Sequence, residues 1–379
     1  MKNSYKKQLV WWGPVYSYSG YAQHNRAIIF ELLKLGWDIR LLPTESDIPD
    51  GLIGKDRLQS LTKNTHINLE QSICMNLVPP PALPQWGKYT VLYTTLESKT
   101  VHPGFLNRIQ QYDEIWIPCE DNFISIATSL TKRIPLKVVP EGVDLSLWSS
   151  TTPPDKQYKK NIFTFFFCGD WSYRKGNDIL IRAFSEAFHY TEPVRLVLFV
   201  HYQGSGPEKT YETVTREINY FKTKFSIKNL PQIDIIGEHH DDKDMPGIFK
   251  CADVGFFPTR GEAWMLPGIQ LMSLGIPIIT TAWGGQTDYC NKANSYLIDV
   301  EKFDTIDDKV NCMVDFQKGQ LLAFPDIDHT VRLLRLAYQR QDIRVSKSHS
   351  CLRQIRRDFD WKEAGIIADR RLTKILKTL

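Results

Sequence analysis

The chain has 379 residues, of which 42% are hydrophobic and 24% are charged, and its formal net charge is +4. This composition excludes disordered and fibrous proteins, and the length is sufficient for two domains. A net charge of this size does not by itself indicate a nucleic-acid partner.

The first half of the chain alternates between strand-like and helix-like patterns. A loop rich in Gly, Ser and Pro is predicted at 13–20, and a helix at 21–35 that ends at Gly36. Such alternation indicates a parallel sheet covered by helices. The polar stretch 149–155 contains two prolines and is the best domain boundary. The predicted strands of this half are Gln8–Trp12, Trp37–Pro43, Tyr89–Leu96, Glu114–Pro118 and Leu136–Pro140.

The second half repeats this architecture. Helices are predicted over 178–190 and 209–225, and ligands are expected at the carboxyl ends of the strands. We therefore expect an α/β chain of two Rossmann-like domains, residues 1–150 and 156–357, followed by a C-terminal helix over 358–379. The predicted strands are Phe163–Cys168, Arg195–His201, Gln232–Ile236, Val254–Phe257, Pro277–Ala282 and Tyr296–Ile298.

The last part of the chain is basic. Residues 331–379 contain 13 basic and five acidic side chains, a net charge of +8. Trp361, Ile366, Ile367 and Leu372 place apolar side chains along a terminal helix. This pattern agrees with a solvated basic helix face, and also with attraction toward an anionic membrane or a polyanionic acceptor.

Cysteine usage and hydrophobic segments bear on the location of the protein. Seven cysteines occur without any CxxC spacing, which argues against a disulfide framework or a zinc site and favours a reducing compartment. No window is long enough for a membrane span, and the apolar run near the N-terminus is too short for a signal peptide. We therefore expect a cytoplasmic protein, with peripheral membrane contact left open by the basic tail.

The stretch 258–285 carries most of the functional signal. It predicts a loop with an exposed carboxylate, Glu262, between a buried strand and a helix that begins at Pro267. Gln270 lies in the first turn of this helix, and Gly275 ends it. The helix N-terminus directs free N–H groups and its positive dipole end above the sheet, which favours a diphosphate. Glu262 is placed to bind neutral hydroxyls beside that anion, so the stretch predicts a sugar-nucleotide site.

This arrangement resembles the donor loop of family 4 retaining glycosyltransferases, which have the GT-B fold. Their motif has two glutamates separated by seven residues; here Glu262 holds the first position and Gln270 the second. Residues 139–144, 174–184 and 244–249 resemble the family's interdomain signature, phosphate-contact segment and pre-donor helix, in the same order. The resemblance implies two domains facing across a cleft, with the C-terminal helix crossing back to the N-terminal domain.

The resemblance also implies a reaction without a metal or another cofactor. Cationic side chains and N–H groups then stabilise the departing diphosphate. Lys175, just before Gly176, matches the family's lysine. The family's arginine position, directly after Gly169, is Asp170 here and has the wrong charge, so Arg174 is the candidate for the second cation. The alternative for Arg174 and Lys175 is that both are solvated loop charges.

Gln270 replaces an acid that binds the ribose hydroxyls in the family. A glutamine accepts from one hydroxyl and donates to another but lacks the charge-assisted bond, so we expect weaker nucleotide affinity or a different nucleotide preference. Met265 and Leu266, at the start of the same helix, are expected to contact the donor. The alternatives are a helix-surface position for Gln270 and an ordinary loop acid for Glu262.

Residues of the N-terminal half are expected on the opposite wall of the site. In the family, the loop at 16–26 approaches the diphosphate and the acceptor, and here it places Ser19 and Gly20 at a second helix N-terminus. Glu97, at the end of a predicted strand, either orients an acceptor hydroxyl and steadies positive charge on the sugar, or caps the loop around His102. The predicted catalytic residues are Glu262, Lys175, Arg174 and Glu97, and the predicted donor-binding residues are Ser19, Gly20, Gly169, Met265, Leu266 and Gln270.

Three functions remain open on the sequence. A metal-independent retaining glycosyltransferase that uses a nucleoside-diphosphate sugar fits the motifs best. A non-catalytic GT-B protein that binds sugar nucleotide or glycan is supported by Asp170 and Gln270, and a nucleotide-sugar epimerase lacks identifiable acid and base residues. The acceptor is open among a glycan, a lipid-linked sugar, a protein, a small molecule and modified DNA, because fold analogy does not choose between them.

Overall fold

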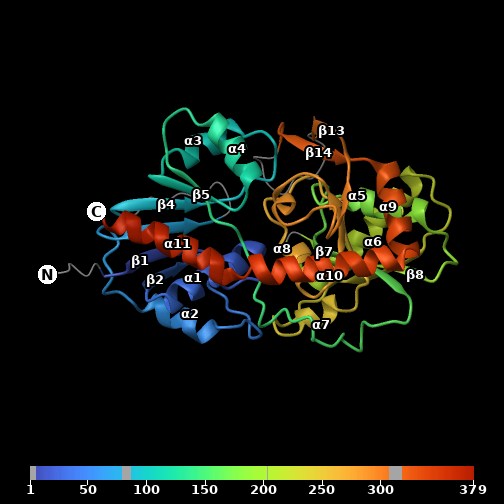
Figure 1. Ribbon diagram of the computed structural model, residues 1–379, viewed down its shortest axis with the longest axis horizontal. Helices are drawn as coiled ribbons and strands as arrows, with labels where there is room; N and C mark the ends of the chain where they lie inside the picture. Colours follow the sequence, from blue (N-terminus) through green and yellow to red (C-terminus); the bar gives the residue numbers. More distant parts are fainter. Residues whose placement is uncertain (1–5, 79–86, 203, 307–317) are drawn as a thin grey trace. The chain divides into compact units, whose positions relative to one another are not determined.

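The computed structural model divides the chain into two compact units (Figure 1). The structure describes residues 6–78, 87–202, 204–306 and 318–379. Unit 1 comprises Met1–Leu96, Val101–Asp144 and Asp358–Leu379, and unit 2 comprises Glu97–Thr100 and Leu145–Arg357. The chain therefore leaves unit 1 twice: once for the four residues that begin at Glu97, and once for the long segment between Asp144 and Asp358.

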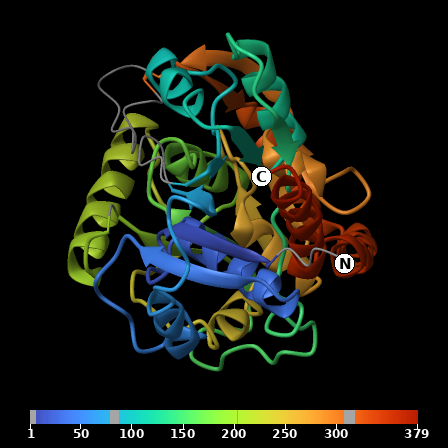
Figure 2. The same ribbon diagram turned by 90° about the vertical axis from the view of Figure 1, so that its left-hand side faces the viewer.

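Unit 1 contains a six-stranded parallel sheet with the strand order β2-β1-β3-β4-β5-β6. Figure 2 shows β1 and β2 side by side. Its central strands are almost wholly buried, as expected for a sheet that helices cover on both faces. The strands are β1 (Gln8–Gly13), β2 (Asp38–Pro43), β3 (Ile73–Leu77), β4 (Tyr89–Tyr93), β5 (Glu114–Ile117) and β6 (Leu136–Val138). The helices are α1 (Gly20–Lys34), α2 (Lys55–Thr62), α3 (Pro103–Ile109), α4 (Glu120–Ser129) and α11 (Trp361–Leu376).

The C-terminal helix α11 belongs to unit 1 and packs against α1. A side chain at Gly365 would come within 2.4 Å of Glu31 Cβ, so glycine permits the close approach of the two helices. Arg371 forms a two-pronged ion pair with the buried carboxylate of Glu114, at 2.7 and 2.5 Å. Part of the basic charge of the tail therefore serves to dock this helix.

Unit 2 contains a second six-stranded parallel sheet, with the order β12-β11-β10-β7-β8-β9, and a two-stranded antiparallel sheet of β13 and β14. The strands are β7 (Phe163–Asp170), β8 (Val194–His201), β9 (Gln232–Ile236), β10 (Val254–Phe257), β11 (Ile278–Thr281), β12 (Tyr296–Ile298), β13 (Val300–Thr305) and β14 (Leu321–Pro325). The helices are α5 (Asn177–Ala187), α6 (Pro207–Lys224), α7 (Met245–Phe249), α8 (Leu266–Ser273), α9 (Ile327–Gln339) and α10 (Gln341–Asp358), and a short 3-10 helix covers Gly285–Asp288.

Each sheet has a point at which the strand order reverses. In unit 2 the chain builds outward from β7 through β8 to β9, and then returns to the other side of β7 with β10. In unit 1 the reversal lies between β1 and β3. Open parallel sheets bind ligands outside the carboxyl ends of the strands at such reversals, which directs attention to the loops after β7 and β10 and after β1.

The predicted two-domain α/β architecture is confirmed, while several elements differ from the prediction. The strand predicted to reach residue 96 ends at Tyr93, because the chain turns away and the N–H of Leu96 donates to Asn122 Oδ1 at 2.8 Å. Strand β3, the β13–β14 hairpin and helix α10 were not predicted. The predicted linker at 149–155 lies in unit 2, where the N–H of Asp155 donates to Gly247 O at 2.9 Å. None of the helices in the described ranges is long and apolar enough to span a membrane.

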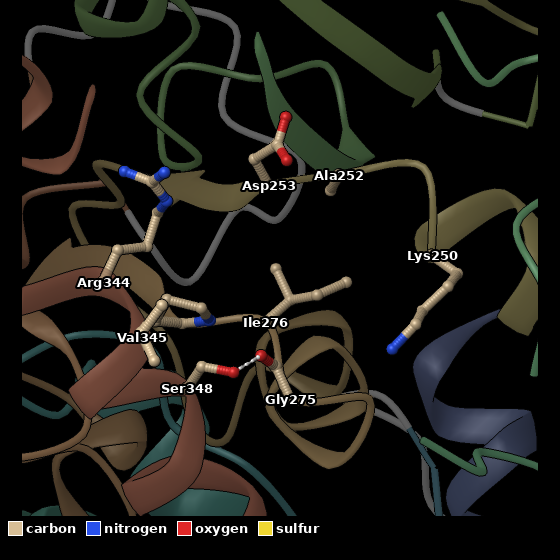
Figure 3. Close-up of a pocket in the computed structure, with 9 residues that line it drawn as sticks. Lys250, Ala252, Asp253, Gly275, Ile276, Arg344, Val345 and Ser348 are labelled. Carbon is tan, nitrogen blue, oxygen red and sulfur yellow. Dashed lines mark hydrogen bonds between the residues drawn. The ribbon is translucent and has the colours of Figure 1, made fainter. Parts of the chain in front are cut away.

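A pocket in unit 2 lies at the amino-terminal edge of β10 and β11, away from the reversal loops (Figure 3). Its two cations serve helix ends: Lys250 Nζ donates to Leu274 O at 2.7 Å, and Arg344 Nη1 donates to Ala337 O at 2.6 Å. The pocket therefore lies where α10 packs against the turn after α8, and its cations have structural partners there. The lining residues are Lys250, Ala252, Asp253, Gly275, Ile276, Pro277, Arg344, Val345 and Ser348.

Candidate functional site

The loop after β7 closes tightly against the end of β10. Strand β7 ends with Gly169 and Asp170, and six residues then lead to α5. Gly176 ends this loop at φ +78°, and a side chain there would come within 2.2 Å of Pro258 O. Only glycine combines that backbone conformation with that approach, so the two loops at the strand reversal are held in contact.

Glu262 lies in the loop after β10 and its carboxylate is buried, with 5% of the residue exposed. Lys175 Nζ donates to both carboxylate oxygens, at 2.7 and 2.9 Å, and Thr259 Oγ1 donates to one of them at 3.1 Å. Burial alone would raise the pKa of Glu262, but the charges of Lys175 and Arg174 and these hydrogen bonds outweigh it and lower the pKa. Glu262 is therefore an anion, and the prediction that it is exposed is wrong because the cations of the β7 loop cover it.

Arg174 joins Glu262 to a second carboxylate. Its Nη1 lies 3.5 Å from Glu262 Oε2 and donates to Gly261 O at 2.6 Å, while Nη2 lies 3.2 Å from Glu97 Oε1. The alternative of solvated loop charges is wrong, because the side chains of Arg174 and Lys175 are only 8% and 15% exposed. The four predicted catalytic residues thus form one chain of alternating charge, in the order Glu97, Arg174, Glu262 and Lys175.

The segment at 97–100 reaches this cluster because it packs on β14 within unit 2. Lys99 N donates to Leu321 O at 2.8 Å, and Leu321 N donates to Thr100 Oγ1 at 2.9 Å. A side chain at Gly261 would meet Glu97 O at 1.9 Å, so glycine is needed for this approach. His102 caps α3 through its own Nδ1, which accepts from a backbone N–H at 3.0 Å, whereas the carboxylate of Glu97 lies against Arg174.

The start of α8 is fixed in an unusual conformation. Met265 precedes the helix at φ +73° and ψ +70°, and the hydroxyl of Tyr289 donates to the carbonyls of Trp264 and Met265 at 2.9 Å each. Left-handed backbone at a non-glycine residue persists where the surroundings hold it, and such positions gather at functional sites. Leu266 begins the helix, one residue before the predicted start at Pro267, and Gln270 is its fifth residue. Gln270 is 8% exposed, so the helix-surface alternative is wrong.

A pair of glycines after β11 holds the backbone of the Glu262 loop. Gly285 N donates to Glu262 O at 2.8 Å. A side chain at Gly285 would meet Ala263 O at 1.8 Å, and one at Gly284, where φ is +104°, would meet Glu262 O at 2.8 Å. Glycine is therefore required at both positions because the two backbones approach closely. This contact fixes the backbone of Glu262, and so the point from which its side chain extends.

Arg260 is a part of the site that the sequence analysis missed. Its guanidinium forms two bonds of 2.8 Å with the carboxylate of Asp178, in a pair 82 residues apart in the chain. The guanidinium also lies 3.6 Å from the centre of the Tyr173 ring, and the backbone N–H of Arg260 donates to Arg174 O at 2.7 Å. Arg260 therefore ties the β10 loop to the β7 loop, and no local pattern in the sequence pairs it with Asp178.

Asp170, the last residue of β7, lies near two histidines. Asp170 lies beside His201 in the register of β7 and β8, and the His201 ring stacks on His239 with 4.6 Å between centroids. Burial and His239 lower the pKa of His201, while the charge of Asp170 opposes this change. The position at which the resemblance leads one to expect an arginine is thus an acid beside two histidines.

The predicted site residues fall in both units. Gly169, Met265, Leu266, Gln270 and the charge cluster lie at the strand reversal of unit 2. A side chain at Gly169 would lie 3.8 Å from Lys175 Cε, which places this glycine beside the cluster. Ser19 and Gly20 lie in unit 1, where Ser19 Oγ accepts from Ala22 N at 3.2 Å and caps α1, and Gly20 begins that helix. Within the described ranges, no group of three or more His, Cys, Asp or Glu side chains is arranged to hold a metal ion.

Comparison with known proteins bears directly on unit 2. Residues 162–315 match the family model described as glycosyl transferases group 1. The matched segment covers less than half of the chain. It contains Lys175, Arg174 and Glu262, so three members of the charge cluster lie within the match and Glu97 lies outside it.

Curated relatives match part of the chain. The chain is 26% identical over 159 residues to mannosylfructose-phosphate synthase of Agrobacterium fabrum, covering 41% of this chain and 34% of that protein. It is 26% identical over 203 residues to putative glycosyltransferase 45 of Sulfolobus islandicus filamentous virus, covering 52% and 49%. It is 24% identical over 172 residues to D-inositol 3-phosphate glycosyltransferase 1 of Catenulispora acidiphila, covering 44% and 39%. The matches thus span between about a third and about a half of these relatives.

Solved structures match nearly the whole chain. Sucrose-phosphate synthase from Thermosynechococcus elongatus has a TM-score of 0.70 at 12% identity, covering 98% of this chain and all (100%) of that one. Anabaena HepE in complex with UDP-glucose has a TM-score of 0.64 at 11% identity, covering 98% and 100%. An E. coli structure described as trehalose-6-phosphate bound with UDP-2-fluoro glucose has a TM-score of 0.65 at 12% identity, covering 96% and 98%. At these identities the likeness establishes the fold, which is GT-B.

Proposed function

We propose that the chain is a metal-independent, retaining glycosyltransferase that moves a sugar from a nucleoside-diphosphate sugar to an acceptor hydroxyl. The observation that carries this proposal is the buried, anionic Glu262 held between Lys175 and Arg174 at the strand reversal of the segment that matches the glycosyl transferases group 1 model. The structural neighbours that contain UDP-glucose or UDP-2-fluoro glucose support a donor of this class.

Donor binding would rearrange the ion pairs of the cluster. A diphosphate carries more charge than a carboxylate and gives Lys175 a stronger partner. Release of Lys175 leaves the carboxylate of Glu262 free to accept hydrogen bonds from the hydroxyls of the sugar. Met265 and Leu266 at the start of α8 then face the phosphate with the positive end of the helix dipole, and Gln270 is the candidate for the ribose hydroxyls.

The transfer itself exchanges one C–O bond for another. The bond between C1 of the sugar and the diphosphate oxygen breaks, and its electron pair leaves with the diphosphate. The acceptor oxygen bonds to C1 on the same face, and its proton passes to the departing phosphate oxygen, so the configuration is retained. Lys175 and Arg174 stabilise the negative charge that builds on the leaving group. Glu97 steadies positive charge on the sugar or orients the acceptor hydroxyl.

A non-catalytic protein that binds sugar nucleotide or glycan is the second candidate. It is favoured by the acid at Asp170, which lies beside His201 where a cation would assist the departing diphosphate, and by the amide at Gln270. The two candidates predict the same binding but differ in turnover, since only the enzyme cleaves its donor.

The basic tail suggests a location for the reaction. Arg353, Arg356 and Arg357 of α10 are exposed, and such a group attracts an anionic membrane surface by about 1 kcal/mol for each cation. We propose peripheral membrane contact through this face, for a protein that otherwise works in the cytoplasm. We expect the protein to sediment with phosphatidylserine vesicles but not with phosphatidylcholine vesicles. Arg→Gln changes at these three positions should abolish this sedimentation.

The deciding experiment begins with a panel of nucleotide sugars in a thermal-shift assay, because a ligand that binds only the folded state raises the melting temperature. The donor found in this way is then incubated with the protein, and release of the nucleoside diphosphate is measured with and without excess EDTA. Slow donor hydrolysis that survives chelation supports the enzyme. Binding without hydrolysis, also in the presence of glycan, lipid-linked, protein, small-molecule and modified-DNA acceptors, would favour the non-catalytic candidate.

A further inference from the structure

In unit 1, the loop after β1 is held by one acidic and one basic side chain. Glu45, two residues beyond β2, accepts three consecutive backbone N–H groups: Val15 at 2.9 Å on Oε2, and Tyr16 and Ser17 at 3.3 and 3.2 Å on Oε1. Arg26 of α1, which is 6% exposed, donates from Nη1 to the carbonyls of Val15 and Ser17, at 2.9 and 2.7 Å. Both polar groups of two loop residues are thus engaged by a charged partner.

These hydrogen bonds restrain the loop after β1. Successive backbone N–H groups that converge on one point make a concavity that attracts an anion, and here the protein's own carboxylate fills it. Bonds to charged partners are about twice as strong as neutral ones, so the loop cannot shift without loss of several strong bonds. Val15 and Tyr16 are also buried, with 0% and 4% exposed, so their packing in the core further restrains the loop.

The held loop lies at the strand reversal of unit 1. A side chain at Gly13 would meet Leu77 O at 2.3 Å, so the loop leaves β1 pressed against β3. It then runs to Ser19 and Gly20 at the start of α1, both exposed. The position of these two residues is therefore set by the loop, and the loop is set by Glu45 and Arg26.

We propose that Glu45 is a positioning residue of the transfer reaction: its carboxylate, seated on the N–H groups of residues 15–17, fixes the loop that presents Ser19 and Gly20. This inference rests on the proposed function and on the place of the loop at the strand reversal of unit 1, where open parallel sheets bind ligands. It also assigns the chemistry of the loop. Because the carboxylate of Glu45 already accepts the N–H groups of residues 15–17, this part of the loop does not offer them to a substrate.

The test uses three single variants of the full chain. Glu45→Gln keeps the shape and removes the charge, Glu45→Ala opens a space that acetate can fill, and Asp47→Asn removes an exposed acid two residues away as the matched control. Amide hydrogen exchange of residues 15–17 should accelerate at least about tenfold in both Glu45 variants and stay unchanged in Asp47→Asn. In both Glu45 variants, the kcat of donor hydrolysis or transfer should fall about tenfold, which is within the range for a loop displaced by a fraction of an ångström. The KM for the donor should stay within about twofold of the wild-type value.

Acetate distinguishes positioning from a loss of stability. Added acetate should restore part of the kcat and the slow amide exchange in Glu45→Ala but not in Glu45→Gln, where the amide fills the space. Unchanged exchange at residues 15–17 in both variants would show that Glu45 does not hold the loop. Faster exchange with an unchanged kcat would show that the loop position is irrelevant to the reaction. If the wild-type protein neither binds nor cleaves any sugar nucleotide, the proposed function fails, while the exchange data still decide whether Glu45 holds the loop.

Discussion

The two units differ in how they use charged side chains at the carboxyl edge of a parallel sheet. Unit 2 places charged side chains at the strand reversal itself, where Arg174 and Lys175 both pair with the buried Glu262. Unit 1 places its charges, Glu45 and Arg26, against the backbone of the loop. The charges of the first edge therefore pair with one another, whereas those of the second hold the backbone of the loop in place.

The difference has an energetic basis. Burying charge costs free energy unless the charge is paired and hydrogen-bonded, and a buried pair is strongly destabilised when one partner is lost. The cluster of unit 2 is therefore sensitive to every substitution within it. In unit 1 the same strong bonds go to the backbone, so that the exposed tip of the loop can vary without leaving a buried charge.

The largest expected effect comes from breaking the cluster of unit 2. Glu262→Ala or Lys175→Ala should each lower turnover by about 10²–10³-fold, the scale for loss of one preorganised charge-stabilising group. The double variant should lose little more than either single one, because the two side chains act as a pair. Steady-state donor hydrolysis measures the effect, with Lys243→Ala, an exposed lysine of α7's preceding turn, as the control. Near-normal turnover in both single variants would remove Lys175 and Glu262 from the site.

A second prediction tests whether the glycines of unit 2 position the cluster. Gly285→Ala brings a side chain within 1.8 Å of Ala263 O and should displace the Glu262 loop, lowering the free energy of unfolding by about 1–3 kcal/mol and weakening donor binding. Gly206→Ala is the control, since nothing lies within 4 Å of a side chain there. Chemical denaturation and donor titration give the two quantities. Equal stability of the two variants would mean that the loop tolerates displacement.

The pH dependence of stability offers a third test. In the folded protein the pKa of Glu262 lies below its ordinary value, so its pairing stabilises the fold above the ordinary pKa of glutamate and is lost as the pH falls through the lower, folded value. In Lys175→Met the burial remains while the nearest cation is gone, so the pKa of Glu262 should rise and the loss should begin at higher pH. Melting temperatures from about pH 3 to about pH 7, each compared with the corresponding Glu262→Gln protein, measure the shift. If the melting temperatures of the wild type and Lys175→Met fell at the same acidic pH, the pairing of Lys175 with Glu262 would be contradicted.

The smallest effect is expected at Gln270, where the chain departs from the family motif. Gln270→Glu should tighten nucleotide binding by about 1 kcal/mol, roughly fivefold in Kd, because a carboxylate accepts stronger bonds from two neighbouring hydroxyls. Titration of UDP, GDP and ADP into both forms measures the change, with Gln341→Glu on the exposed start of α10 as the control. Weaker binding would show that the pocket is built around the amide, and no change with any nucleotide would show that Gln270 does not line it.

Several features could be predicted because they depend only on residues that are close together in the sequence. Apolar runs such as the one that became β7 are buried on both faces, and Gly275 ends α8 as expected, at φ +81°. Strand β3 escaped prediction because Asn76, a polar residue, is fully buried within a run of only five residues. Helix α10 escaped because it buries only two side chains, Cys351 and Ile355, and shows little apolar periodicity.

The sequence by itself determined the alternation of strands and helices, the division into two α/β domains and the candidacy of Glu262 and Lys175, since each depends on neighbours within a few residues. Only the tertiary structure decided that Glu262 is buried, that Arg174 joins it to Glu97, and that glycines let the loops touch. Those outcomes depend on pairs such as Arg260 and Asp178, which are 82 residues apart. Their physical reason is that a charge is held in the interior only where a partner from another loop meets it, and that meeting is a property of the folded chain.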